Sequence, residues 1–90
     1  MTKIGGETLR KIRIAYGLTQ TELSALCGVT AGMINKIERG KYPMTDSVLK
    51  ALVRELSLTP EKIVVLLAEY DRIAERKQFA KSKILREAAV

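Results

Sequence analysis

The sequence of 90 residues contains no histidine, no tryptophan and only one cysteine, Cys27. Without histidine the chain lacks a common metal ligand and the side chain that exchanges protons near neutral pH. A single cysteine cannot form a disulfide within the chain. No nucleophile lies beside a base in the sequence, so we expect no catalytic activity, no metal site and no cofactor.

Long apolar runs and aromatic residues are also scarce. No run approaches the roughly 18 apolar residues that span a bilayer, and the N-terminal sequence MTKIGGETLRK lacks the apolar stretch and cleavage site of a secretory signal. We therefore expect a cytoplasmic chain that has no membrane partner. Three tyrosines and one phenylalanine are too few to form a stacking surface for single-stranded nucleic acid.

Positive charge is in excess. Sixteen lysines and arginines against ten acidic residues give a net charge of +6 and a pI near 9.7. This balance favours a polyanionic partner, and nucleic acid is the first candidate. The hydrophobic content of 47% over 90 residues predicts one folded domain with a modest core.

The apolar residues recur at helical spacing, and no segment shows the alternation that is typical of strands. Leu9, Ile12 and Tyr16 share one helix face, and Gly17 follows as a stop signal. We expect an all-α chain with helices over residues 7–16, 20 to 26 or 27, 30–39, 46–56, and from residue 60 to the C-terminus. No repeat or low-complexity tract interrupts this pattern.

Several helix ends carry clear signals. Thr19 and Glu22 form a capping-box pattern, in which each side chain accepts a hydrogen bond from the other residue's backbone N–H. Gly28 is expected to end the second helix in the left-handed conformation. The other predicted N-caps are Thr30, Thr45 and Thr59.

The segment TQTELSALCGVTAGMINKIE holds two helices of about two turns each, which are too short to be stable alone. Leu23 and Cys27 would face inward, and the small Ser24 would let the second helix approach. Gly28 would make the turn, and Ile34 would belong to the contact between the helices. This spacing predicts a helix-turn-helix whose second helix has an outer face free for a ligand.

The series LRKIRIAYGLTQTELSALCGVTAGMINKIERGKYPMT resembles the helix-turn-helix of the phage repressor and Cro family, also called Xre-type, above all in GLTQ, CGVT and IERG. The resemblance covers residues 9–67 and implies a compact five-helix domain that binds double-stranded DNA as a homodimer on a pseudo-palindrome. In such proteins the third helix enters the major groove. We expect a DNA-binding domain over residues 1–70 and a basic helical extension over residues 71–90.

The resemblance also suggests which side chains meet DNA. The expected base-reading residues are Thr30, Ala31, Gly32, Asn35 and Lys36. The expected phosphate-binding residues are Arg10, Thr19, Gln20, Arg39, Lys41 and Tyr42. The charge pattern agrees independently, because residues 8–44 hold six basic residues against two acidic ones.

Ala31 and Gly32 cannot donate side-chain hydrogen bonds to bases. We expect Ala31 to contact a thymine methyl group and Gly32 to admit the DNA backbone or a base edge. Asn35 is the best candidate for direct reading, because its amide can pair with both N6 and N7 of adenine. Thr30 is expected to cap its helix whether or not it also contacts DNA.

Four residues have structural interpretations, which for Tyr42 is an alternative to DNA contact. Arg13 and Glu38 match a family pair that joins the first helix to the end of the third, so we expect a partly buried salt bridge between them. Cys27 is expected to act as a small core residue. Tyr42 is a candidate for either a phosphate contact or a packing role.

The C-terminal helix is expected to pack against the core and against a second protomer through Ile63, Leu66, Leu67, Tyr70 and Ile73. Its basic end, with six basic and three acidic residues over 71–90, has three possible fates: a longer coiled contact, added DNA contact, or a frayed tail. The predicted function is a dimeric repressor or controller protein. The alternative is a protein-interaction module, antitoxin-like or a scaffold, whose partner binds the long helix.

Overall fold

A computed structural model describes residues 4–88, with side chains through residue 83. The described residues form five α-helices and no strand, so the predicted fold class is confirmed. The helices are α1 (Gly6–Ala15), α2 (Gln20–Cys27), α3 (Ala31–Glu38), α4 (Asp46–Leu56) and α5 (Pro60–Ala88). Each boundary up to the start of α5 lies within one residue of its predicted position, and the predicted end at the C-terminus lies outside the described residues.

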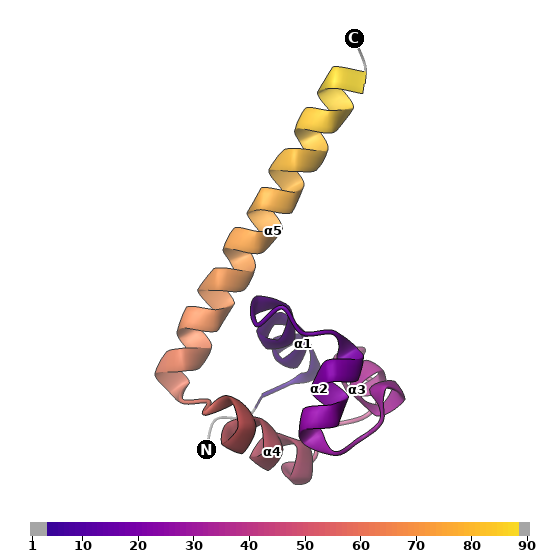
Figure 1. Cartoon of the computed structure of the whole chain (residues 1–90), viewed down its shortest axis with the longest axis vertical. Coiled ribbons are helices and arrows are strands. Elements are labelled where there is room, and N and C mark those ends of the chain that lie inside the picture. The colour runs from indigo at the N-terminus through magenta and orange to yellow at the C-terminus, as the bar shows by residue number, and fades with distance from the viewer. Residues whose placement is uncertain (1–3, 89–90) are drawn as a thin grey trace.

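Helices α1 to α4 form a globule, and α5 leaves it as a long rod (Figure 1). The first half of α5 packs mainly against α1, whereas its second half projects beyond the globule. The described chain therefore measures 52 × 29 × 19 Å. Helices α2 and α3 lie beside each other and also contact α4 and α1, respectively.

The core receives apolar side chains from every helix. Almost fully buried are Leu9, Ile12, Leu23, Ile34, Ile37, Val48 and Leu52. Among the described side chains of α5, only that of Leu66 is buried in this core. Burial of each such side chain contributes about 1.5–3 kcal/mol, and these contacts hold together helices that are too short to form alone.

The helix ends follow the predicted local chemistry. The Thr19 hydroxyl accepts a hydrogen bond from the Glu22 backbone N–H at 3.0 Å, and the Glu22 carboxylate accepts one from the Thr19 N–H at 2.9 Å. Thr30, Thr45 and Thr59 likewise accept bonds from backbone N–H groups three residues later. Gly28 has φ 69°, in the left-handed region, and ends α2 as predicted.

Gly6 fixes how α1 approaches α3. A Cβ atom at this position would overlap the backbone carbonyl oxygen of Ile37 near the end of α3. The first turn of α1 therefore touches the backbone of the helix that carries the predicted base-reading residues. Sequence analysis did not detect this contact, because a glycine near a helix start has several common explanations.

Candidate nucleic-acid interface

Helix α3 presents one exposed face. Gly32, Lys36 and Arg39 follow each other at intervals of four and three residues, so they share this face, and all three are exposed. The opposite face carries Ile34 and Ile37, which are buried in the core. The packing thus fixes the orientation of α3 and leaves a cationic surface outside.

The N-terminus of α3 is open and capped. The Thr30 hydroxyl accepts the Met33 backbone N–H at 3.1 Å, which leaves the hydroxyl hydrogen able to donate to another group. Ala31 is half-buried, and a Cβ atom at Gly32 would lie in open space, 3.9 Å from the Thr30 hydroxyl oxygen. The missing side chain at Gly32 is therefore not required by packing within this chain.

The contact between α2 and α3 is built from small residues. Ser24 is buried, and its hydroxyl donates to the Thr21 carbonyl oxygen at 2.7 Å, so no polar group is left unpaired there. Cys27 is also buried, and this burial is the main reason why the pKa of its thiol is raised. A raised pKa lowers the thiolate fraction, which agrees with the predicted core role of Cys27.

Arg13 and Glu38 join α1 to the end of α3. The guanidinium donates two hydrogen bonds to the carboxylate, from Nε to Oε2 at 2.7 Å and from Nη2 to Oε1 at 3.0 Å. Arg13 also donates to the Leu18 carbonyl oxygen at 2.9 Å. The Glu38 side chain is only 2% exposed, so this bidentate pair is shielded from solvent. The expected salt bridge is present.

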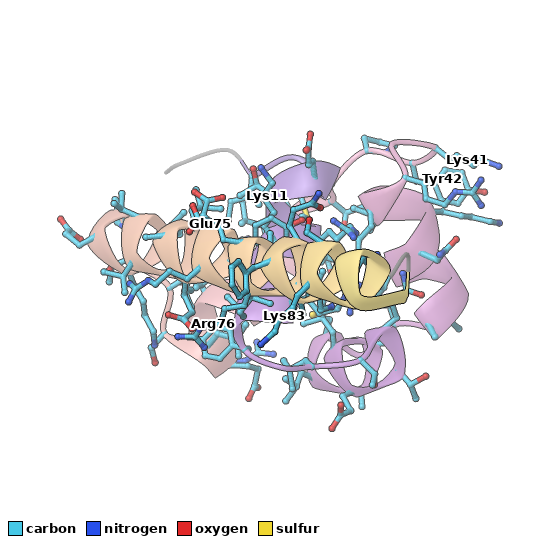
Figure 2. The ribbon with its side chains drawn as sticks, turned by 90° about the horizontal axis from the view of Figure 1, so that it is seen from above. Lys11, Lys41, Tyr42, Glu75, Arg76 and Lys83 are labelled. Atoms are coloured by element: carbon cyan, nitrogen blue, oxygen red, sulfur yellow. The ribbon has the colours of Figure 1, made fainter. Side chains whose placement is uncertain are left out.

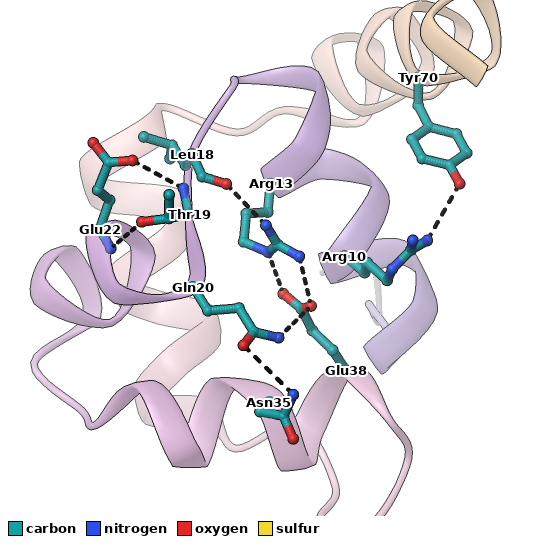
Figure 3. A network of polar contacts seen from close by, with 9 residues as sticks. All are labelled: Arg10, Arg13, Leu18, Thr19, Gln20, Glu22, Asn35, Glu38 and Tyr70. Atoms are coloured by element: carbon teal, nitrogen blue, oxygen red, sulfur yellow. Dashed lines mark hydrogen bonds and ion pairs between the residues drawn. The ribbon is translucent and has the colours of Figure 1, made fainter. Parts of the chain in front are cut away.

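Gln20 and Asn35 extend this network (Figure 3). Gln20 Nε2 donates to Glu38 Oε1 at 3.1 Å, and Asn35 Nδ2 donates to Gln20 Oε1 at 3.4 Å. Sequence analysis placed both residues at DNA, and neither bond was predicted. A contact between Gln20 and phosphate through its side chain would have to compete with both of these bonds.

Lys36, in the last turn of α3, contacts Tyr42 in the loop that follows, which also carries Lys41. The Lys36 ammonium group lies 5.0 Å from the centre of the Tyr42 ring, within the range of a cation–π contact. Lys41 and Tyr42 are exposed and project from the edge of the molecule, away from α5 (Figure 2). Tyr42 therefore orients the ammonium group of Lys36 through this cation–π contact, a role that the sequence did not suggest.

Arg10 and Lys11 of α1 both contact Tyr70 on α5. The Arg10 guanidinium donates to the Tyr70 hydroxyl at 3.2 Å, and the Lys11 ammonium group lies 5.5 Å from the centre of the same ring. Both residues thus support the packing of α1 on α5. Arg10, which was expected to bind phosphate together with Arg39 and Lys41, thus has a partner within the chain.

Comparison with known proteins identifies the family of this helical domain. The profile of the helix-turn-helix family matches residues 9–63, more than half of the chain. The chain belongs to the Xre-type helix-turn-helix family. It is 30% identical over 80 residues to the transcriptional regulator ClgR of Mycobacterium tuberculosis, in two strains, with 89% of this chain and 70% of the relative covered.

Solved structures show the same fold at lower identity. The Xre-type chain superposes on the clp gene regulator ClgR of Corynebacterium glutamicum with a TM-score of 0.57, 23% identity, and 86% and 83% of the two chains covered. The restriction-modification controller protein C.Esp1396I gives a TM-score of 0.56 at 23% identity, covering 72% and 83%. A proposed antidote protein of a plasmid maintenance system from Nostoc punctiforme gives 0.56 at 18% identity, covering 100% and 99%.

In this Xre-type chain three of the five residues predicted for core and dimer packing of α5 pack against the chain's own globule. Leu66 is buried in the core, Ile63 packs against the core, and Tyr70 contacts Arg10 and Lys11. The expected packing of α5 on the core is thus confirmed for Leu66 and Ile63, whereas the dimer contact of these residues stays a prediction. A stripe with three- and four-residue spacing marks an apolar helix face but does not say whether the chain itself covers it.

Within residues 4–88, no helix is both long enough and apolar enough to cross a membrane. Among the described side chains, no three His, Cys, Asp or Glu residues lie together as potential metal ligands. The exposed face of α3, with the loop that follows it, is the candidate functional site.

Proposed function

We propose that the protein is a dimeric, sequence-specific transcriptional regulator that reads a pseudo-palindromic operator with α3 in the major groove. The observation that carries this proposal is the exposed cationic face of α3, held in a fixed orientation by the ion pair between Arg13 and Glu38. The family match and the similarity to ClgR support a regulatory role. Repression is the expected mode, because a bound dimer excludes other proteins from its site.

The proposed DNA contacts divide into two groups. Residues at the start and outer face of α3 read bases: Thr30, Ala31, Gly32, Asn35 and Lys36. Flanking residues bind phosphates: Thr19, Arg39, Lys41 and Tyr42. Gln20 is left out of the second group because both ends of its amide are bonded to Glu38 and Asn35, and Arg10 because its guanidinium donates to Tyr70 of α5.

A different face of α5 is the proposed dimer surface. Val64, Val65 and Phe79 are large apolar residues with exposed fractions of 67%, 62% and 72%. Val65, Ala68 and Phe79 lie on one side of the helix, because separations of 3 and 11 residues are close to whole numbers of helical turns. This outer face lies opposite the stripe of Leu66, so a second protomer can cover it without disturbing the core. The described part of α5 beyond residue 70 then belongs to the interface as well.

Selection of binding sites from a random duplex library tests the function. We expect an enriched sequence made of two inverted half-sites whose centres are about 34 Å apart, one helical turn, because each protomer presents one α3. Affinity for this site should fall steeply with salt, whereas the preference over random duplex should persist. Failure to enrich any sequence at low salt would refute the proposed function.

Light scattering tests the dimer surface. Val65→Lys should shift the mass toward that of a monomer, because it places a charge in an apolar contact. Ser47→Lys, on the exposed surface of α4, is the matched control and should leave the mass unchanged. A monomeric wild-type protein, or an unchanged mass for Val65→Lys, would contradict this assignment.

The second candidate function is a protein-interaction module. The exposed apolar side chains of α5 favour it, since the same outer face can bind a different protein. The structural similarity to the proposed antidote protein concerns the fold alone. A wild-type protein that remains monomeric and enriches no DNA sequence would favour this function over the first.

A further inference from the structure

Four side chains form a continuous chain of hydrogen bonds from α1 to α3. Arg13 donates to Glu38, Gln20 donates to Glu38, and Asn35 donates to Gln20 (Figure 3). Gln20 stands at the first position of α2, and Asn35 lies on the flank of α3 that faces it. The network therefore ends at the border of the proposed DNA-binding face.

The negative charge of Glu38 determines which group donates and which accepts in each hydrogen bond of this network. A carboxylate paired with a guanidinium only accepts hydrogen bonds, so Gln20 must turn its NH₂ group toward it. The carbonyl oxygen of Gln20 then points to the other side, where it can only accept. Asn35 must therefore turn its own NH₂ group toward Gln20. One buried charge thus sets the orientation of two amides in succession.

The consequence is a fixed polarity at Asn35. Figure 3 shows its amide nitrogen turned toward Gln20 and its carbonyl oxygen turned away. In the major groove the hydrogen-bond donors are the exocyclic amino groups of adenine and cytosine. An acceptor held in one place selects the base pair orientation that brings such an amino group to it.

We propose that Gln20 is a positioning residue that fixes the amide of Asn35, so that Asn35 distinguishes a base pair from its inverted form through the exocyclic amino group. This inference rests on the proposed function, because it requires α3 to lie in the major groove. It assigns Gln20 a specificity role in place of the phosphate contact expected from the sequence. The two roles predict different effects of the same substitution.

The difference lies in which affinities change. A phosphate contact strengthens binding to every duplex about equally and carries little sequence information. A positioning role changes the preference at one base pair and leaves the preferences at other positions unaltered. Discrimination at a single position therefore separates the two roles, whereas affinity for one operator does not.

The experiment uses the full chain and the operator selected from random duplexes. Asn35→Ala first identifies the base pair whose preference depends on this side chain. For the wild-type protein, we expect inversion of that pair, or an analogue without the exocyclic amino group, to weaken binding about fivefold or more. For Gln20→Leu, which removes both amide groups, we expect the inversion penalty to fall below about twofold, since a released amide can turn over.

A charge swap provides the sharper test. In the double variant Gln20→Glu with Glu38→Gln the net charge is unchanged, and residue 20 still offers only acceptors to Asn35. We expect this variant to recover the inversion penalty even if its overall affinity is lower. A phosphate contact predicts the reverse, because a carboxylate at position 20 repels the DNA backbone. Lys41→Ala is the control and should lower affinity for both orientations equally.

Each outcome decides between the two proposals. If the wild-type protein selects no sequence, the proposed function fails and this inference fails with it. If it selects an operator but Gln20→Leu weakens both orientations equally, only the positioning role is overturned. The same holds if the amino-group analogue binds the wild-type protein as well as the natural base does. Thermal unfolding of each variant shows whether a change in preference occurs in a folded protein.

Discussion

Gly32→Ala should affect folding and DNA binding in opposite directions. Glycine in a helix costs about 0.5–1 kcal/mol relative to alanine, because its unfolded state has more conformational freedom. Gly32 lies in the first turn of α3, and a Cβ atom there would meet nothing closer than the Thr30 hydroxyl oxygen at 3.9 Å. We therefore expect about 0.5 kcal/mol of added stability, or a rise in Tm of about 2–4 °C for a domain of this size.

Binding should weaken, because Gly32 is proposed to admit the DNA backbone or a base edge. A methyl group in a closely packed contact costs about 1–3 kcal/mol, so we expect affinity for the selected operator to fall about fivefold or more. The loss cannot result from unfolding, since the variant is the more stable protein. Higher stability together with weaker DNA binding distinguishes a glycine that is required for function from one that is tolerated by chance.

The assay pairs thermal unfolding with a fluorescence binding titration on the selected operator. Ala25→Gly, at an exposed position of α2, is the matched control. It should lower stability by about the amount that Gly32→Ala adds and leave affinity unchanged, because Ala25 is not among the proposed DNA contacts. Equal or tighter operator binding by Gly32→Ala would show that close approach at this position is not required.

Three further substitutions test the structure. Glu38→Gln should lower the free energy of unfolding by about 1–3 kcal/mol, as measured in urea, because Arg13 loses a charged acceptor within a shielded pair. The same substitution should weaken operator binding. No change in either measurement would show that the pair does not support α3. Gly6→Ala should be more damaging than Glu38→Gln, since its Cβ atom would overlap the Ile37 carbonyl oxygen, and a wild-type Tm would contradict this. Burial raises the pKa of the Cys27 thiol, so its contribution to stability is fully present below the ordinary thiol pKa of about 8.5 and is lost as the pH rises through the raised value. Cys27→Ala should therefore lose less stability between pH 7 and pH 10 than the wild-type protein, and equal losses in urea unfolding would oppose this reasoning.

The helix boundaries could be predicted because their signals are local. The bonds between Thr19 and Glu22 span three residues, and the left-handed conformation of Gly28 depends on its own lack of a side chain. Such features act in the same way in any fold that contains the segment. The pairing of Arg13 with Glu38, in contrast, was expected only from the family resemblance, because 25 residues separate the two partners.

The orientation of individual polar side chains could not be predicted in the same way. Gln20 and Asn35 are 15 residues apart, and both carry groups that can bind protein or DNA equally well. Their choice is settled by the position of Glu38, which in turn depends on how α1 packs on α3. The contact of Gly6 with the Ile37 backbone has the same origin, since it exists only after the two helices have met.

The basic residues show how unpredicted side-chain contacts limit what the sequence can say about DNA binding. Residues 8–44 contain six basic side chains, which in a dimer would contact up to twelve phosphates and give a salt dependence of log K on log salt near about −11. The structure assigns Arg10, Lys11 and Arg13 to partners on α5, α1 and α3, which leaves Lys36, Arg39 and Lys41 on the side of the recognition helix. With Lys36 assigned to bases, Arg39 and Lys41 make four phosphate contacts per dimer, which correspond to a slope of about −4. A measured slope near the steeper value would mean that the basic residues of α1, or the basic end of α5, also reach the DNA.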